Sequence, residues 1–196
     1  MEVLMRLRLL SKKDVQRALP MKECIELMKA AFAQLSSGQA HVPLRSQLPV
    51  TAHEGVTIFM PAYLAQSGDL GVKIVSVFPR NVKADLPTIH AVGAYTPQMQ
   101  KVDSETIRRA KVVIDSRQAS LVEAGDLIIP LQQGLITEKH IYAEIGEIVA
   151  GQKAARESKD EITYFKSVGI AVQDVAAARR VLDKATEMGL GQEVEL

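Results

Sequence analysis

The chain has 196 residues, a net charge of +1 and one cysteine. This length can bury the core of a sizeable domain without disulfides, and 24 basic against 23 acidic side chains argue against nucleic acid or an anionic membrane as partner. Apolar residues make up 47%, and no apolar run approaches the roughly 18 residues of a membrane span. We therefore expect a cytoplasmic globular protein with Cys24 in its core rather than acting as a reactive thiol.

The first half of the chain is expected to form two helices and then a run of strands. Arginines alternate with leucines within residues 1–10, which predicts a strand, and Ser11 with Asp14 forms a capping-box pattern that begins a helix ending before Pro20. A second helix is expected from Met21 to about Leu35. The apolar period then changes to two, which predicts strands at 42–50, 56–60, 70–78 and 88–92.

The second half alternates between short helices and short strands. The sequence predicts helices at 104–110, 117–124, 138–149 and 170–188, and strands at 111–115, 162–166 and 193–196. We therefore expect an α+β fold, in which a mixed, curved sheet is built from the N-terminal strands and the C-terminal strand, with helices on one face. A small α/β segment is expected as an appendage.

Most motifs of known chemistry are missing from the sequence. A dinucleotide fingerprint, Gly-x-Gly-x-x-Gly, places its glycines between a strand and a helix so that the backbone can approach a pyrophosphate. Here Gly189 and Gly191 follow a helix, and neither a Walker loop nor a Gly-x-Ser-x-Gly elbow is present. The four histidines, at 41, 53, 90 and 140, share no element at ligand spacing, so no metal site is expected.

Two cations in expected strands, Arg45 and Lys73, are the best candidates for ligand binding. An arginine can grip a carboxylate with two hydrogen bonds, whereas a lysine on an apolar strand must be paired or shift its pKa. The strand around Lys73 looks apolar on both faces, as is typical of a central strand. The alternative, that Arg45 faces solvent and Lys73 pairs with a structural acid, stays open.

Eight short stretches form a familiar set. They are VPLR at 42–45, FMPAY at 59–63, GVK at 71–73, LPT at 86–88, VGAY at 92–95, VIDS at 113–116, IGEIVAG at 145–151 and FKSVGIAVQD at 165–174. In this order they resemble the ornithine cyclodeaminase/mu-crystallin family, which includes archaeal alanine dehydrogenases and ketimine reductases. The resemblance implies a substrate domain that is built from both ends of the chain and dimerises through its sheet, with an inserted Rossmann domain that binds NAD(P).

The middle of the sequence departs from the family pattern. Residues 88–91 run directly into residues 92–94, which resemble a strand near the end of the Rossmann domain. A complete Rossmann domain needs several βαβ units of roughly 30 residues each. The resemblance thus implies that residues 1–91 and 131–196 are the two parts of the substrate-binding and dimerisation domain, and that residues 92–130 are a remnant of the nucleotide-binding domain.

The resemblance also assigns candidate substrate residues. Arg45 would grip the substrate carboxylate, and Lys73 and Met60 would line the same pocket. Cyclodeaminases and alanine dehydrogenases place an aspartate where Tyr95 stands, and a phenol with an ordinary pKa of about 10 is a poor base at neutral pH. No residue is therefore given a catalytic role, and an intact relative is expected to resemble an imine reductase more than a cyclodeaminase.

Lys166, Ser167 and Val168 would lie near the nicotinamide of an intact member, and we expect them to be vestigial here, with no cofactor bound. The leading hypothesis is a non-catalytic substrate-binding and dimerisation domain, natural or engineered, which forms a homodimer or larger homo-oligomer and binds a small amino acid, keto acid or imine. One alternative is a working NAD(P)-dependent oxidoreductase or cyclodeaminase, whose nucleotide site is completed by a second chain. The other is a purely structural domain without a ligand.

Overall fold

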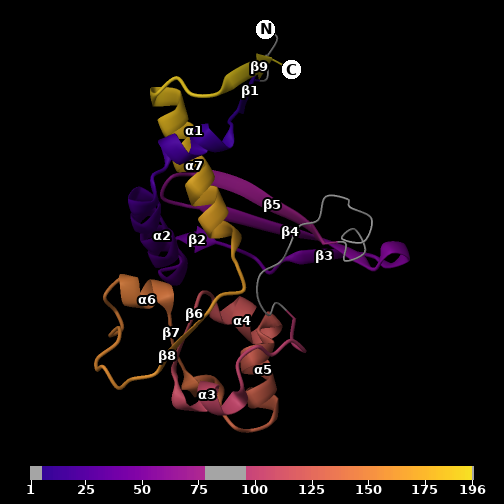
Figure 1. Ribbon diagram of the computed structural model, residues 1–196, viewed down its shortest axis with the longest axis vertical. Coiled ribbons are helices and arrows are strands. Elements are labelled where there is room, and N and C mark those ends of the chain that lie inside the picture. The colour runs from indigo at the N-terminus through magenta and orange to yellow at the C-terminus, as the bar shows by residue number, and fades with distance from the viewer. Residues whose placement is uncertain (1–5, 78–95, 196) are drawn as a thin grey trace.

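The computed structural model describes residues 6–77 and 96–195. Its strands form three separate sheets, with two, four and three members. Figure 1 shows the two-stranded sheet at one end of the long axis, the four-stranded sheet in the middle and the three-stranded sheet towards the other end. The expected α+β class is confirmed, but the strands are divided among three sheets instead of forming one mixed sheet. The strand predicted at 88–92 and Tyr95 lie outside the described residues.

The two-stranded sheet joins the beginning and the end of the described chain. Strand β1 (Arg6–Leu9) pairs antiparallel with β9 (Gln192–Glu195). Helix α1 (Lys12–Ala18) follows β1 and begins with the predicted capping box, because the Ser11 hydroxyl accepts from the Asp14 amide while the Asp14 carboxylate accepts from the Ser11 amide. This local prediction is confirmed, since both groups belong to one turn of the chain.

The four-stranded antiparallel sheet has β4 at its centre. Its strands are β2 (Ala40–His41), β3 (Ser46–Val50), β4 (Gly55–Leu64) and β5 (Asp69–Val77), and β4 pairs with each of the other three. The single strand predicted at 42–50 is therefore wrong, because the chain leaves the sheet between β2 and β3. The position of Arg45 follows from this break.

Strand β5 was expected to be central and covered on both faces, and this prediction is wrong. Within the described residues β5 pairs only with β4. Its alternate side chains Leu70, Val72 and Ile74 are 77%, 57% and 57% exposed. The apolar residues on both faces of the strand suggested two covering layers, but helix α7 covers only one face.

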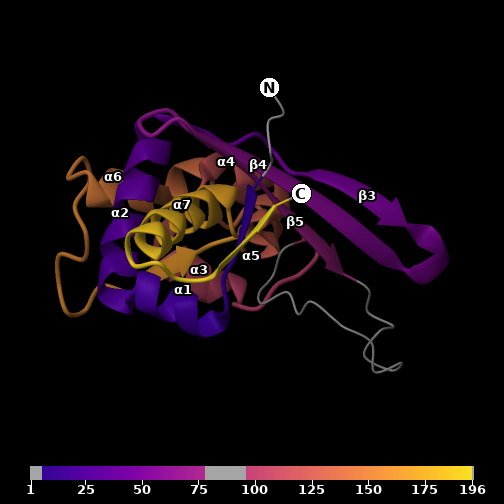
Figure 2. The same cartoon turned by 90° about the horizontal axis from the view of Figure 1, so that it is seen from above.

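Two long helices build the first core over the four-stranded sheet. Helix α2 (Met21–Ser36) packs against α7 (Ala171–Glu187), and α7 contacts β4 and β5. Gly71 permits this close approach, because a Cβ atom there would lie 2.7 Å from Cγ2 of Val175. Figure 2 shows β3 and the adjoining ends of β4 and β5 extending beyond these helices. The central core residues of this layer are Ala31, Phe32, Ile58, Met60, Ala62, Ile170 and Val172.

The parallel sheet forms the second core. Strand β6 (Lys111–Ile114) lies between β7 (Ile141–Glu144) and β8 (Thr163–Lys166). The helices of this part are α3 (Ser104–Arg109), α4 (Arg117–Glu123) and α5 (Gly125–Gln132). The predicted boundary at residue 130 thus lies between strands of one sheet, with β6 before it and β7 and β8 after it. The boundary itself stays a prediction.

The helix predicted at 138–149 is wrong. The segment contains a short 3-10 turn (Glu138–His140), strand β7 and then the five-residue helix α6 (Ile145–Val149). Buried Ile141 and Ala143 alternate with half-buried neighbours and pair with β6, so the period of two decided the structure. Helix α5 was not predicted.

Helix α6 connects the two larger sheets by packing closely on α2. A Cβ atom at Gly146 would lie 2.1 Å from the Phe32 carbonyl oxygen, so only glycine fits this crossing. Next to it, the Ser36 hydroxyl donates to the Glu144 carboxylate at 3.0 Å. Among the helices that the structure describes, none has the length and apolar character needed to cross a membrane.

Candidate substrate-binding site

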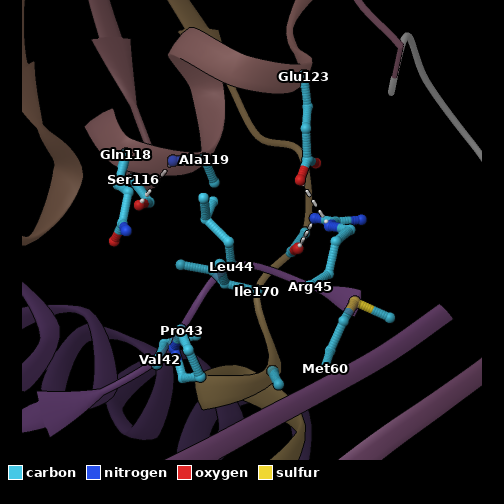
Figure 3. A pocket seen from close by; sticks show the side chains of 12 residues that line it. Val42, Pro43, Leu44, Arg45, Met60, Ser116, Gln118, Ala119, Glu123 and Ile170 are labelled. Atoms are coloured by element: carbon cyan, nitrogen blue, oxygen red, sulfur yellow. Dashed lines mark hydrogen bonds and ion pairs between the residues drawn. The ribbon is translucent and has the colours of Figure 1, made fainter. Parts of the chain in front are cut away.

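Arg45 lies in the extended segment between β2 and β3 and points towards α4, as Figure 3 shows. Its Nε forms an ion pair with Oε1 of Glu123 at 2.8 Å, and the side chains are 12% and 8% exposed. Its Nη2 donates to the carbonyl oxygens of Val168 and Gly169 at 3.2 and 2.8 Å. Arg45 therefore does not face solvent, and its orientation is fixed by groups from two distant segments.

A cavity of about 20 Å³ lies beside the Arg45 side chain. Its walls include Leu44, Met60, Ala119 and Glu123. A volume of this size holds about one water molecule. Met60 is 7% exposed and faces the cavity from β4, so the structure brings two of the three predicted substrate residues together.

Glu123, at the end of α4, is a site residue that the sequence reasoning missed. It is 6% exposed, and its Oε2 atom has no hydrogen-bond partner among the described residues. Burial raises the pKa of the Glu123 carboxyl, which the Arg45 charge opposes and the Asp115 charge reinforces. The available signal was a single acid within the apolar stretch 119–125.

Lys73 is placed near this cavity but not in it. It lies opposite Met60 in the register of β4 and β5. Its ammonium donates to the Asp174 carboxylate of α7 at 3.1 Å, and the two side chains are 36% and 45% exposed. The structure therefore agrees with the alternative stated from the sequence, in which Lys73 pairs with an acid of the chain.

Two buried carboxylates hold the end of β8 and the segment after it. The Lys166 ammonium donates to Asp126 at 2.8 Å. The Ser167 hydroxyl and the backbone amides of Val168 and Gly169 donate to one oxygen of Asp115, at 2.7, 2.8 and 3.1 Å. These bonds fix the two carbonyl groups that receive the Arg45 guanidinium.

The same hydrogen bonds occupy the residues that were expected to contact the nicotinamide. The predicted cofactor contacts at residues 166–168 already bond to carboxylates of this chain. A phosphate-binding glycine loop precedes a helix, whereas the positive-φ glycines at 38, 134, 151 and 189 come just after helices. Gly169 also has a positive φ and does lie between β8 and α7, but its amide already donates to Asp115. The described residues therefore do not form a fitting cradle for the pyrophosphate of NAD(P).

Comparisons with known proteins agree with the sequence motifs. The profile of the ornithine cyclodeaminase/mu-crystallin family matches residues 5–93 and 88–189. A Δ1-pyrroline-2-carboxylate reductase of Bacillus cereus is 38% identical over 146 residues, which cover 69% of this chain and 45% of that protein. The chain thus spans about half the length of such curated relatives.

Two solved structures have the same fold. The Δ1-pyrroline-2-carboxylate reductase of Thermococcus litoralis, in complex with NADH and L-proline, matches with a TM-score of 0.85 and 26% identity over 96% of this chain and 100% of that chain. An archaeal alanine dehydrogenase dimer with bound NAD matches with a TM-score of 0.82 and 19% identity, covering 97% of this chain and 99% of that chain. On the two profile matches, which together include most of its residues, this chain belongs to the ornithine cyclodeaminase/mu-crystallin family.

Proposed function

We propose that this protein serves the NAD(P)-dependent reduction of a small cyclic imino acid, and that the chain supplies the substrate-binding part. The observation that carries the proposal is the buried guanidinium of Arg45, which is held by fixed acceptors beside a cavity. The similarity to two Δ1-pyrroline-2-carboxylate reductases supports the choice of an imino acid. It favours this reaction class over ornithine cyclodeamination.

Arg45 is assigned to the ligand carboxylate. Its Nη1 atom has no hydrogen-bond partner among residues 6–77 and 96–195, so it can donate to a ligand. Met60 supplies the apolar wall from β4. Lys73 is assigned to the edge of the site, where its ammonium would have to leave Asp174 before it could reach a ligand.

The nucleotide must be held by another part of the active assembly. NAD(P)H supplies the hydride in such a reduction, but the described residues lack a fitting cradle for it, so we derive no hydride step from this chain. We propose that the chain alone binds and orients the imino acid without reducing it. Lys166, Ser167 and Val168 remain proposed contacts of the nicotinamide in a complete enzyme.

We further propose that the chain forms a homodimer through the open face of β5. The exposed stripe of Leu70, Val72 and Ile74 is apolar and lies on β5, which pairs with β4 alone among the described strands. Exposed apolar stripes and unpaired strand edges favour association. The archaeal alanine dehydrogenase of the same fold is a dimer, which supports this assignment.

A second candidate function is a working reductase in which a dimer mate or a separate chain completes the nucleotide site. The observation that favours it is the match to the NADH-bound Thermococcus litoralis enzyme, which reaches across that whole chain. Both candidates use the same substrate site. They differ in whether purified protein oxidises NAD(P)H.

The deciding experiment combines binding and turnover. NADH and NADPH are titrated by fluorescence, and their absorbance is followed with Δ1-pyrroline-2-carboxylate present. Steady oxidation establishes the reductase, whereas L-proline binding without oxidation supports the substrate-binding part. Arg45→Met is expected to weaken L-proline binding at least about tenfold, because a charged hydrogen bond is lost, while exposed Arg109→Met leaves it unchanged. Equal binding by both variants would contradict the role of Arg45.

A further inference from the structure

We infer that Glu123 is a second ligand-binding residue, whose Oε2 atom accepts a hydrogen bond from a positively charged nitrogen of the ligand held by Arg45. The site would therefore select zwitterionic imino and amino acids over plain carboxylic acids. The inference rests on the proposed substrate site and adds to it the group that recognises the nitrogen.

The first observation is the orphaned oxygen of Glu123. The side chain is 8% exposed, Oε1 is bonded to Arg45, and the buried Oε2 has no hydrogen-bond partner among the described residues. Buried carboxylate oxygens without a donor are rare, because burial removes the water that would otherwise solvate them. A ligand N–H group at this position would supply the missing donor.

The second observation is the division of the Arg45 donors. The Nε atom is bonded to Glu123, and Nη2 is bonded to two backbone carbonyls. Nη1 has no bond of this kind to any residue that the structure describes, and it carries two N–H groups. The ion pair thus offers a cationic donor from Arg45 and an anionic acceptor from Glu123, which match the carboxylate and the ammonium or iminium of one small molecule.

The small size of the cavity favours zwitterionic ligands over plain carboxylates. At about 20 Å³, the space beside Arg45 is too small for a five-membered ring, so a ligand must enter by separating α4 from the segment at 42–45. Widening the cavity weakens the buried ion pair, which is unfavourable unless each charge also bonds to the ligand. A zwitterion bonds to both charges, whereas a plain carboxylate bonds to Arg45 and leaves Oε2 of Glu123 without a donor.

The neighbouring carboxylate does not replace Glu123 in this role. Asp115 is fully buried, and its oxygens accept from Ser116, Ser120, Ser167, Val168 and Gly169. These five donors leave little capacity for a ligand nitrogen. Among the carboxylates beside Arg45 in the described structure, Glu123 is the one with an oxygen that lacks a partner.

The test compares L-proline with cyclopentanecarboxylate, which has the same ring size and carboxylate but no nitrogen. Calorimetric titration of the full chain is expected to give at least about tenfold tighter binding of L-proline, because one charge-assisted hydrogen bond distinguishes the two ligands. In Glu123→Gln, the amide oxygen can still accept from Arg45 Nε, which turns the NH₂ group towards the ligand nitrogen. That variant is expected to lose most of the preference, whereas Glu138→Gln, an exposed acid, keeps it.

The outcomes separate the inference from the proposed function. Equal affinity of the unmodified chain for both ligands, or an unchanged preference in Glu123→Gln, overturns the role of Glu123 and leaves Arg45 as the carboxylate site. Failure of the unmodified chain to bind either ligand overturns the proposed substrate site and the inference with it. The comparison of the two ligands on the unmodified chain needs no variant, so equal affinities there contradict the role of Glu123 even if Glu123→Gln does not fold.

Discussion

Two buried ion pairs in this protein have the same length but different surroundings. Arg45 and Glu123 approach to 2.8 Å, and so do Lys166 and Asp126. Asp126 also accepts from the amides of Lys101 and Val102 and from the Tyr164 hydroxyl. Glu123 has Arg45 as its partner and one oxygen without any within the described structure.

The pKa values of the two acids shift in opposite directions for this reason. Burial raises the pKa of Asp126, but hydrogen bonds from Lys166 and the two backbone amides outweigh it and hold the pKa below its ordinary value. At Glu123 the effect of burial is larger than that of the Arg45 charge, so the pKa lies above its ordinary value. We therefore expect the fully bonded pair to stabilise the fold, whereas the partly bonded pair keeps the acceptor that we propose for a ligand.

The largest expected effect breaks the fully bonded pair. Asp126→Ala removes the acceptor of four donors, so the free energy of unfolding should fall by about 3–5 kcal/mol. Urea denaturation measures this change. Asp183→Ala, which removes an exposed partner of Arg179, is the control and should cost under about 1 kcal/mol. Similar losses in both variants would contradict the structural role of Asp126.

A smaller effect is expected at the partly bonded pair. Glu123→Ala removes the carboxylate partner of Arg45, which keeps its two carbonyl acceptors, so the free energy of unfolding should fall by about 1–3 kcal/mol. The same urea experiment applies. If Glu123→Ala lowers the free energy of unfolding as much as Asp126→Ala, the two ion pairs contribute equally to stability, which would contradict the expected difference.

The opposite pKa shifts predict opposite effects of pH on stability. Because the folded pKa of Glu123 is raised, the folded state binds this proton more tightly, and stability should decline as the pH rises above the ordinary value of 4.5. The lowered pKa of Asp126 acts oppositely, since its contribution is lost as the pH falls through the range below 3.8. The difference in unfolding free energy between the unmodified chain and Glu123→Gln should therefore shrink with rising pH. A constant difference would contradict the raised pKa.

The smallest effect on folding is expected at the open face of β5. Val72 is 57% exposed, so Val72→Lys should change the free energy of unfolding by under about 0.5 kcal/mol. It should nevertheless convert the proposed dimer to monomers, as measured by light scattering. Met21→Lys, on an exposed position of α2, is the matched control and should leave the mass unchanged. A monomeric unmodified chain would remove the dimer proposal.

The elements predicted well from the sequence are those fixed by neighbouring residues. The capping box at Ser11 and the helix expected at 170–188, observed as α7, depend on contacts within a turn or on one regular apolar face. The helix predicted at 138–149 failed because pairing with β6 turned residues 141–144 into a strand. The prediction that both faces of β5 are buried was wrong for a similar reason, since the sequence pattern of a strand does not show how many layers cover it.

The sequence alone was enough to recognise the family, to note the lack of a dinucleotide fingerprint and to choose Arg45 as the carboxylate candidate. These depend on residue types at short spacing, which can be read along the chain. The contact of Glu123 with Arg45 and that of Lys73 with Asp174 could be seen only in the folded structure. Such contacts join segments that are far apart in sequence. They arise because α4 packs against the segment at 42–45 and α7 packs on β5.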